Sequence, residues 1–293
     1  MILVVGGTGR LGKEAVRLLV ARGAAVRVLS RNAAAAKSPG SDGVEVVTGD
    51  VRDQKDVARA MAGVTTVVSA AHGFMDDPRG IDLGGNVNLI EAAEAAGASH
   101  FVLLSVYGAA EGHPIELFHM KHLAEQRLVA SKLAWTILRP TAFMELWVSL
   151  LAAPLLAKKK TVIFGPGTNP INFVSVPDVA RFVELAVTDP ATRGRVLEIA
   201  GPEDLSFGEL VATYERVTGA SGTKSHVPLP MMRVMAPLMR VLVPSLGRQI
   251  RAGVVMNTRD MTFRGERAPE VPMTTLADAI RRTIATEARS SPA

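Results

Sequence analysis

The sequence contains no cysteine. That absence excludes a disulfide framework, a thiolate nucleophile and a cysteine-ligated metal site, and it leads us to expect a cytoplasmic protein. Aromatic residues are scarce as well, and tyrosine occurs only as Tyr107 and Tyr214. A mechanism that uses a phenol as its acid therefore has few candidates in this chain.

Long hydrophobic runs are also missing. The most apolar stretch, at 141–157, contains Glu145 and Pro154 and is shorter than the ~20 residues that a membrane-spanning helix needs. We interpret this stretch as a buried or pocket-lining helix, with membrane contact as the alternative, and we expect no stable membrane insertion. The first residues read as a strand, without the basic segment and cleavage site of a signal peptide.

Charge of neither sign dominates the chain. Basic residues outnumber acidic ones by 33 to 28, which gives a net charge of +5 and a pI near 9.7. This balance suits an anionic ligand, but the basic residues are scattered rather than interleaved with aromatic ones, so nucleic acid is not an expected partner. The length of 293 residues allows one large domain or a domain with an appended lobe.

Short apolar runs alternate with helical patterns in the first half of the chain. Near-continuous Val, Ile and Leu strands between helices predict a parallel sheet covered on both faces, the doubly wound α/β class, with ligands at the carboxyl ends of its strands. The expected strands are 2–5, 25–30, 44–47, 65–69, 100–104 and 135–138, and the expected helices are about 10–22, 53–62, 80–97 and 114–131.

The alternation loosens after Pro140, which indicates a second region. We expect a ligand-binding domain at 1–155, with 170–200 packing back onto it, and a smaller, mostly helical lobe at 156–293. The segment 227–257 is rich in Met, Pro and Leu. We interpret it either as core packing or as a flexible lid over an apolar substrate, because unbranched methionine adapts to irregular shapes.

Two helix starts in the second region carry capping-box patterns. In "SVPDVARFVELAV", Ser175 stands three residues before Asp178, and in "SFGELVATYERV", Ser206 stands three residues before Glu209. Each pattern predicts a helix that begins just after its serine.

A glycine-rich turn joins the first expected strand to the first expected helix. Gly6, Gly9 and Gly12 in "GGTGRLG" allow a tight turn, close approach of a phosphate to the backbone, and close packing of the helix on the strand. The start of the helix offers free N–H groups and a positive dipole end to a pyrophosphate. The sequence therefore predicts a dinucleotide site, with a glycine-rich turn that binds nothing as the alternative.

The second expected strand ends on a base instead of an acid. A carboxylate at this point would bond a free ribose 2′-hydroxyl and repel a 2′-phosphate, whereas "VLSRN" offers Ser30 and Arg31. Guanidinium groups match phosphate in geometry and charge, and Arg10 in the glycine loop is placed to join them. We therefore predict NADPH in preference to NADH, with two solvated surface arginines as the alternative.

Small and polar residues follow the next two strands. Asp50, in "VTGDVRD", is placed to hold the adenine amino group, with Val51 beside the ring. Ala70 and Ala71 follow the fourth strand, where their small side chains would let the cofactor pass.

With these motifs in place, the chain resembles the short-chain dehydrogenase/reductase superfamily, specifically its atypical, NmrA-like branch. The resemblance covers residues 2 to about 200 and matches only loosely beyond them. It implies a Rossmann fold. Known members of this branch include NADPH-dependent quinone and ketone reductases, reductases of aromatic polyketide antibiotic biosynthesis, and redox-sensing regulators that bind the dinucleotide without turning it over. The segments that carry the resemblance are "GGTGRLG", "GDVRD", "GNVNLIEAAEAAGASHFVLLSVYGA", "KHLAEQRLVASKLAWTILRPTAFME" and "NFVSVPDVARFVELA".

The resemblance implies roles for individual positions. Lys121 matches the family lysine that bonds the nicotinamide ribose, and it is our first catalytic candidate. Ser105 stands near the family's serine after the fifth strand and is the second. The remaining implied cofactor contacts are Gly6, Thr8, Gly9, Arg10 and Leu11 at the pyrophosphate, Ser30 and Arg31 at the 2′-phosphate, Asp50 and Val51 at the adenine, and Pro140, Thr141 and Phe143 beside the nicotinamide.

The chain departs from the superfamily at its usual acid, the tyrosine of Y-x-x-x-K. The stretch here is "LFHMK", and Leu117, which cannot donate a proton, takes the tyrosine position. Candidate donors are Lys121 through a water, Ser105, Tyr107, His119 or a hydroxyl of the substrate itself. Quinones suit the missing acid because the hydroquinone anion is stable.

These observations lead to one expected function and one alternative. We expect NADPH-dependent hydride transfer to a ketone or quinone of an aromatic or polycyclic, polyketide-like substrate. The alternative is a non-catalytic NADP(H)-sensing regulator or assembly subunit. We expect no metal site, and a monomer or homodimer. A group of aromatic residues is expected to border the nicotinamide end, although core packing explains each one equally well: Phe74, Phe118, Phe143 and Trp147.

Overall fold

The computed structural model of the protein describes residues 1–32, 43–73, 77–155, 160–266 and 271–290. The chain divides into two compact units. Unit 1 consists of Met1–Pro140 and Val179–Glu198, so part of the segment 170–200 belongs with the first half of the chain. Unit 2 consists of Thr141–Asp178 and Ile199–Ala293.

A seven-stranded sheet forms the centre of unit 1, in the order β10-β6-β5-β4-β1-β2-β3. The pairings from β3 through β6 are all parallel. This arrangement confirms the predicted doubly wound α/β class. The strands are β1 (Ile2–Val5), β2 (Val26–Ser30), β3 (Glu45–Thr48), β4 (Thr66–Ser69), β5 (His100–Leu104), β6 (Ala134–Pro140) and β10 (Arg195–Ile199).

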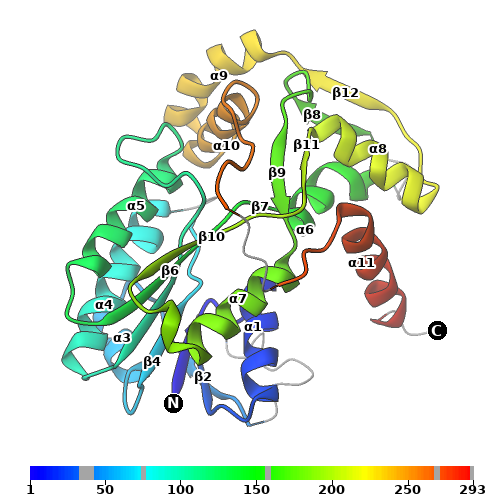
Figure 1. Ribbon diagram of the computed structural model, residues 1–293. Coiled ribbons are helices and arrows are strands. Elements are labelled where there is room, and N and C mark those ends of the chain that lie inside the picture. The colour runs from blue at the N-terminus through cyan, green and yellow to red at the C-terminus, as the bar shows by residue number, and fades with distance from the viewer. Residues whose placement is uncertain (33–42, 74–76, 156–159, 267–270, 291–293) are drawn as a thin grey trace. The chain divides into compact units, whose positions relative to one another are not determined.

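Helices cover the sheet as the right-handed crossovers of such a fold require. Helices α3, α4 and α5 lie on one face and α1 on the other (Figure 1). Arg22, just beyond α1, pairs with Glu184 of α7 at 2.6 Å, so these two helices are neighbours. The helices are α1 (Arg10–Ala21), α3 (Gln54–Ala60), α4 (Asn86–Ala95), α5 (Glu116–Val129) and α7 (Val176–Thr188), with the π-helical turn η1 (Pro78–Gly85) leading directly into α4.

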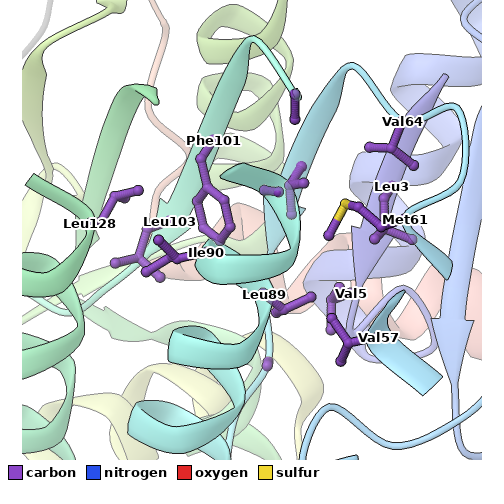
Figure 2. Packing of buried hydrophobic residues seen from close by; sticks show 14 of the residues in the cluster. Leu3, Val5, Val57, Met61, Val64, Leu89, Ile90, Phe101, Leu103 and Leu128 are labelled. Carbon is purple, nitrogen blue, oxygen red and sulfur yellow. The ribbon is translucent and has the colours of Figure 1, made fainter. Parts of the chain in front are cut away.

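A hydrophobic core of unit 1 lies between the sheet and helices α3, α4 and α5. Figure 2 shows Leu3 and Val5 of β1 and Phe101 of β5 packed against side chains such as Val57 of α3 and Ile90 of α4. These strands are almost continuously apolar because side chains on both faces are buried. The core therefore fixes the carboxyl ends of β1, β2, β4 and β5, where the candidate site lies.

Unit 2 combines two small sheets with helices. The strand orders are β11-β9-β7 and β12-β8. Trp147 packs on Phe207 with ring centroids 4.8 Å apart, and Tyr214 lies in the same core. The elements are β7 (Ala142–Phe143), α6 (Met144–Trp147), η2 (Val148–Ala152), η3 (Ala153–Leu155), β8 (Thr161–Phe164), β9 (Ile171–Val174), η4 (Pro190–Thr192, in unit 1), β11 (Glu203–Leu205), α8 (Phe207–Thr218), β12 (Lys224–Val227), α9 (Leu229–Leu242), α10 (Pro244–Met256) and α11 (Leu276–Ser290).

The apolar stretch that begins at Thr141 contributes Met144, Val148 and Leu151 to the unit 2 core. Those burials agree with its interpretation as a buried segment. Among the described residues, no helix has both the length and the apolar character that crossing a bilayer requires.

Both helices with a predicted capping box begin where expected. At α8, the Ser206 hydroxyl accepts the N–H of Glu209 at 3.2 Å and the Glu209 carboxylate accepts the N–H of Ser206 at 2.8 Å, as predicted. Helix α7 also begins where expected, but the Ser175 hydroxyl donates to Glu145 at 2.8 Å, and Asp178 accepts the N–H of Thr274 at 2.7 Å. These side chains bond partners far away in the sequence.

Candidate active site

The loop between β1 and α1 is shaped by glycines that have no room for a side chain. Gly6 has a φ of +80°, and a Cβ on it would lie 2.5 Å from the carbonyl oxygen of Ala70. A Cβ on Gly12 would overlap the carbonyl oxygen of Gly6. Gly9 adopts an extended conformation as the residue that precedes α1, and its N–H donates to the Gly6 oxygen at 3.0 Å. The turn thus folds tightly against the segment that follows β4.

The start of α1 presents its backbone without a side-chain cap. Gly9, the residue before the helix, makes no side-chain cap, and the first turn of the helix holds no acidic residue. Thr8 and Leu11 are half-buried, and Arg10 is exposed. Free N–H groups, a positive dipole end and a neighbouring guanidinium are the features that bind a phosphate group. These residues therefore fit the pyrophosphate of a dinucleotide.

The ends of β2 and β3 bring together the residues expected at the adenosine. Ser30 is buried, and its hydroxyl donates to the carbonyl oxygen of Asn32 at 3.0 Å. Arg31 is exposed. The Asp50 carboxylate accepts a hydrogen bond from the Arg52 guanidinium at 2.7 Å. That bond is the main reason that the pKa of Asp50 lies below its ordinary value, and the nearby charge of Arg31 acts in the same direction.

Asp50 and its neighbour differ in how they are held. The carboxylate also accepts the backbone N–H of Arg52 at 3.0 Å, so it is already engaged at the edge of an open surface depression. Val51 is half-buried against Gly85, where a Cβ would lie 2.6 Å from its side chain. An adenine amino group would therefore compete with Arg52 for Asp50.

Lys121 is buried at the carboxyl end of β4. Its Nζ donates to the carbonyl oxygen of Ala71 at 3.0 Å and lies 3.0 Å from Oδ1 of Asp82. The angles between Nζ and Oδ1 are not those of a hydrogen bond, so charge attraction holds the Lys121–Asp82 pair. The side chains are 4% and 0% exposed. Helix α5 supplies the lysine and η1 the carboxylate.

A polar network fixes Asp82 in its place. Its Oδ2 accepts the N–H of Gly73 at 2.8 Å, and its carbonyl oxygen accepts a hydrogen bond from the Asn86 side chain at 2.7 Å. The hydroxyl of Ser69 donates to Asn86 Oδ1 at 2.6 Å. All of these groups are buried, so each of their hydrogen bonds restrains the carboxylate.

His72 lies beside the same pair, with its Nδ1 3.8 Å from Asp82 Oδ1. Although about half of its side chain is exposed (53%), the partial desolvation of the ring and the positive charge of Lys121 lower the pKa of His72, against the opposite effect of Asp82. The histidine therefore favours its neutral form beside the buried charges.

Sequence reasoning missed Asp82 and His72. A signal for Asp82 was present, because it stands between Ile81 and Leu83 four residues before Asn86, and a carboxylate among apolar residues of a helix calls for a partner. The π-helical turn hid that signal by changing which residues face inward.

The second catalytic candidate comes from the strand that pairs with β4. Ser105 follows β5, is buried, and has an Oγ without a hydrogen-bond partner within the described residues. Its N–H donates to the Leu138 oxygen at 2.8 Å, and the N–H of Tyr107 donates to the Pro140 oxygen at 2.8 Å. Leu117, one helical turn before Lys121, is buried. The tyrosine position of the motif thus holds an apolar side chain inside unit 1.

The residues expected beside the nicotinamide divide between the units. Pro140 ends β6 in unit 1, and Phe143 lies in β7 of unit 2. Phe118 stacks on the His113 ring, with centroids 4.6 Å apart. Trp147 belongs to the unit 2 core, and Phe74 lies outside the described residues. Near the carboxyl end of β4, the structure also brings together Gly6, Ala70, Ala71 and Lys121, which are expected to hold the cofactor.

The sequence of the chain is similar to a known protein family and to several known proteins. Residues 1–247 match the NmrA-like family. The Photosystem II assembly factor Ycf39 of Synechocystis sp. is 30% identical over 242 residues, which cover 82% of this chain and 74% of that protein. A (4-alkanoyl-5-oxo-2,5-dihydrofuran-3-yl)methyl phosphate reductase of Streptomyces griseus is 30% identical over 277 residues, covering 91% of this chain and 94% of that one.

A solved structure shows the same fold. The NADPH-dependent quinone oxidoreductase QOR2 of Escherichia coli, complexed with NADPH, superposes with a TM-score of 0.79 at 21% identity, covering 97% of this chain and all of that one (100%). This likeness supports the Rossmann-like architecture of the central sheet. Together with the match over most of the sequence, it leads to one conclusion: the chain belongs to the NmrA-like family.

Proposed function

We propose that the protein is an NADPH-dependent oxidoreductase that transfers hydride to a ketone or quinone of an aromatic or polycyclic substrate. One set of neighbouring features carries the proposal. The start of α1 has no side-chain cap and follows the tight turn at Gly6–Gly12. Gly6 lies against Ala70 and Ala71, and the Lys121 Nζ donates to the Ala71 oxygen. Membership of the NmrA-like family supports the proposal.

The residues at the ends of two strands favour NADPH. Arg31 is exposed where β2 ends, next to Ser30, and no carboxylate of β2 stands there to repel a 2′-phosphate. Arg10 adds a second guanidinium at the start of α1. In this proposal the α1 terminus holds the pyrophosphate, Arg31 the 2′-phosphate and Lys121 the nicotinamide ribose.

The chemistry of the site selects acceptors that need little acid catalysis. When bound, the dinucleotide supplies two electrons and a proton as hydride. Leu117 donates no proton, and Lys121 is already engaged by Asp82 and Ala71. An acceptor whose anion is delocalised, or which carries its own hydroxyl near the reacting carbonyl, completes the reaction with a proton from water or from itself.

The names of two relatives agree with such acceptors. The E. coli enzyme is named for quinones. The S. griseus enzyme is named for an oxo-dihydrofuran that carries an alkanoyl group, in which a carbon–carbon double bond is conjugated to carbonyl groups. For both compound types, hydride addition gives a delocalised oxyanion.

Oxidation of NADPH, followed by its absorbance, tests the proposal. The panel contains quinones, aromatic ketones with and without a neighbouring hydroxyl, and plain aliphatic ketones. We expect turnover with quinones and hydroxyaryl ketones and little with aliphatic ketones. Turnover of all ketones at equal rates would contradict the role given to the acceptor, and a lack of NADPH binding in calorimetry would contradict the site itself.

A second candidate function rests on Leu117. A chain that holds leucine in place of the usual acid is also suited to bind NADPH without turnover, as an assembly or sensing subunit. The similarity to Ycf39, named as an assembly factor, favours this candidate. Tight NADPH binding without oxidation by any member of the panel would decide for it.

A further inference from the structure

Helix α9 of unit 2 has two apolar faces, and only one of them is packed. On the inner face, Met232 is buried, and its methyl group lies 2.9 Å from where a Cβ of Gly253 in α10 would stand. Gly247 of α10 also lies so close to the backbone of Arg240 that a side chain would overlap it. Figure 1 shows the two helices side by side. Helix α10 therefore covers one side of α9.

The other face of α9 is apolar and exposed. Val234 is 73% exposed and Val241 is 81% exposed. Met231 and Leu238 lie on the same side, since positions three and four apart are neighbours on a helix. We call this face, completed by Leu242, the outer α9 face. Contiguous apolar patches of this kind mark interaction surfaces.

The stretch of sequence that contains α9 carries charge of one sign only. From Glu215 to Asp260 the sequence contains no acidic residue between these two ends. Arg233 and Arg240 are exposed on α9 itself. The basic residues of the stretch are Arg216, Lys224, Arg233, Arg240, Arg248, Arg251 and Arg259.

We propose that the outer α9 face docks on a membrane surface rich in anionic phospholipid, with its apolar side chains in the headgroup boundary and its arginines on the phosphates. An apolar face combined with a basic polar face is the pattern of helices that lie in the plane of a bilayer interface. The 14 residues of α9 are too few to span a bilayer, so the contact is peripheral. The uniform positive charge favours this occupant over a second copy of the chain, whose own α9 region would repel it.

Co-sedimentation of the full chain with vesicles tests the proposal. We expect binding to vesicles of phosphatidylcholine mixed with phosphatidylglycerol, weak binding to phosphatidylcholine alone, and loss of binding as salt rises. The double variant Val234→Asp/Val241→Asp should lower the binding constant more than about tenfold. Replacing Arg233 and Arg240 by Gln should lower it by about fivefold for each arginine.

A matched control separates the outer α9 face from general effects of added acid. Val162→Asp/Val196→Asp makes the same chemical change at valines that are 43% and 42% exposed on β8 and β10. It should bind vesicles more tightly than Val234→Asp/Val241→Asp. Equal losses in the two double variants would overturn the assignment to α9.

Because the chain has no native cysteine, a dye on one introduced cysteine can report contact of that position with the membrane. A polarity-sensitive dye on Val234→Cys should shift its emission to the blue on anionic vesicles, whereas the same dye on Ser221→Cys, an exposed site outside α9, should not. Equal dye responses at both sites would refute the proposal. So would a dimer in analytical ultracentrifugation that Val234→Asp/Val241→Asp dissociates, in a chain that binds no vesicles. NADPH binding and oxidation are measured separately and do not enter either readout.

Discussion

Removal of the negative charge of Asp82 should destabilise unit 1 strongly. Asp82→Asn keeps the shape of the side chain but leaves the Lys121 ammonium buried with the Ala71 carbonyl as its partner. Two unit charges 3.0 Å apart attract by about 5–6 kcal/mol at an effective dielectric constant of ~20, before their desolvation is subtracted. Breaking a buried pair from one side costs about 3–5 kcal/mol. We expect a loss in the free energy of unfolding within that range.

Urea unfolding followed by circular dichroism measures the effect in a double-mutant cycle. The cycle consists of Asp82→Leu, Lys121→Met and the double variant Asp82→Leu/Lys121→Met, which replaces the pair by apolar side chains of similar size. Asp82→Asn is measured beside it. Because neither charge is then left alone, the double variant should regain most of the stability that Asp82→Asn loses. NADPH binding should not return with it, since Lys121 is absent.

Two results would refute this reasoning. A loss below about 1 kcal/mol in Asp82→Asn would show that solvent reaches the ammonium and that the pair is not buried in solution. Additive effects of the single variants in the cycle would show that the two side chains do not interact.

Four further predictions concern sites apart from this pair. Arg31→Glu should weaken NADPH binding about 10–100-fold and spare NADH, as measured by calorimetry. Gly12→Ala should abolish binding of both nucleotides, because its Cβ would overlap the Gly6 oxygen. Burial of His100 lowers its pKa to about 4, below its unfolded value of about 6.5, so stability should fall by up to about 3 kcal/mol as pH drops from 6.5 to 4, and less in His100→Gln. Ser206→Ala should cost about 1 kcal/mol in urea unfolding through the lost cap of α8.

Strands β1 to β6 of unit 1 and the helices between them were predictable from the sequence to within a few residues, whereas the edge strand β10 was not among the expected strands. Their apolar periods are strong, and glycines at the turns adopt the backbone conformations that other residues resist, as Gly6 and Gly23 do with φ near +80° and +75°. Local patterns of this kind do not depend on the rest of the fold. The capping box at Ser206 was predictable for the same reason, because both of its partners lie within one turn.

Features that depend on distant partners escaped prediction. The Ser175 hydroxyl donates to Glu145, and Asp178 accepts from Thr274, which lies far along the chain, and no local pattern indicates either bond. Asp82 meets Lys121 only because η1 and α5 pack together, and the π-helical turn changes the face that its residues present. The sequence alone supplied the lysine but not its counter-ion.

Lys121 and Leu117 together indicate a role for the buried Lys121–Asp82 pair. A buried ion pair is a poor source of stability, because apolar side chains of equal volume commonly do as well or better. Leu117, one turn before Lys121 on α5, is already apolar and buried, so this part of the interior accommodates apolar side chains. In the proposed function, the charge at Lys121, held by Asp82 and the Ala71 carbonyl, serves a ligand that it meets in a fixed position. Because Leu117 replaces the usual tyrosine, this proposed role is orientation of a bound dinucleotide and not proton delivery. It agrees with an acceptor that needs no acid and equally with a subunit that binds NADPH without turnover.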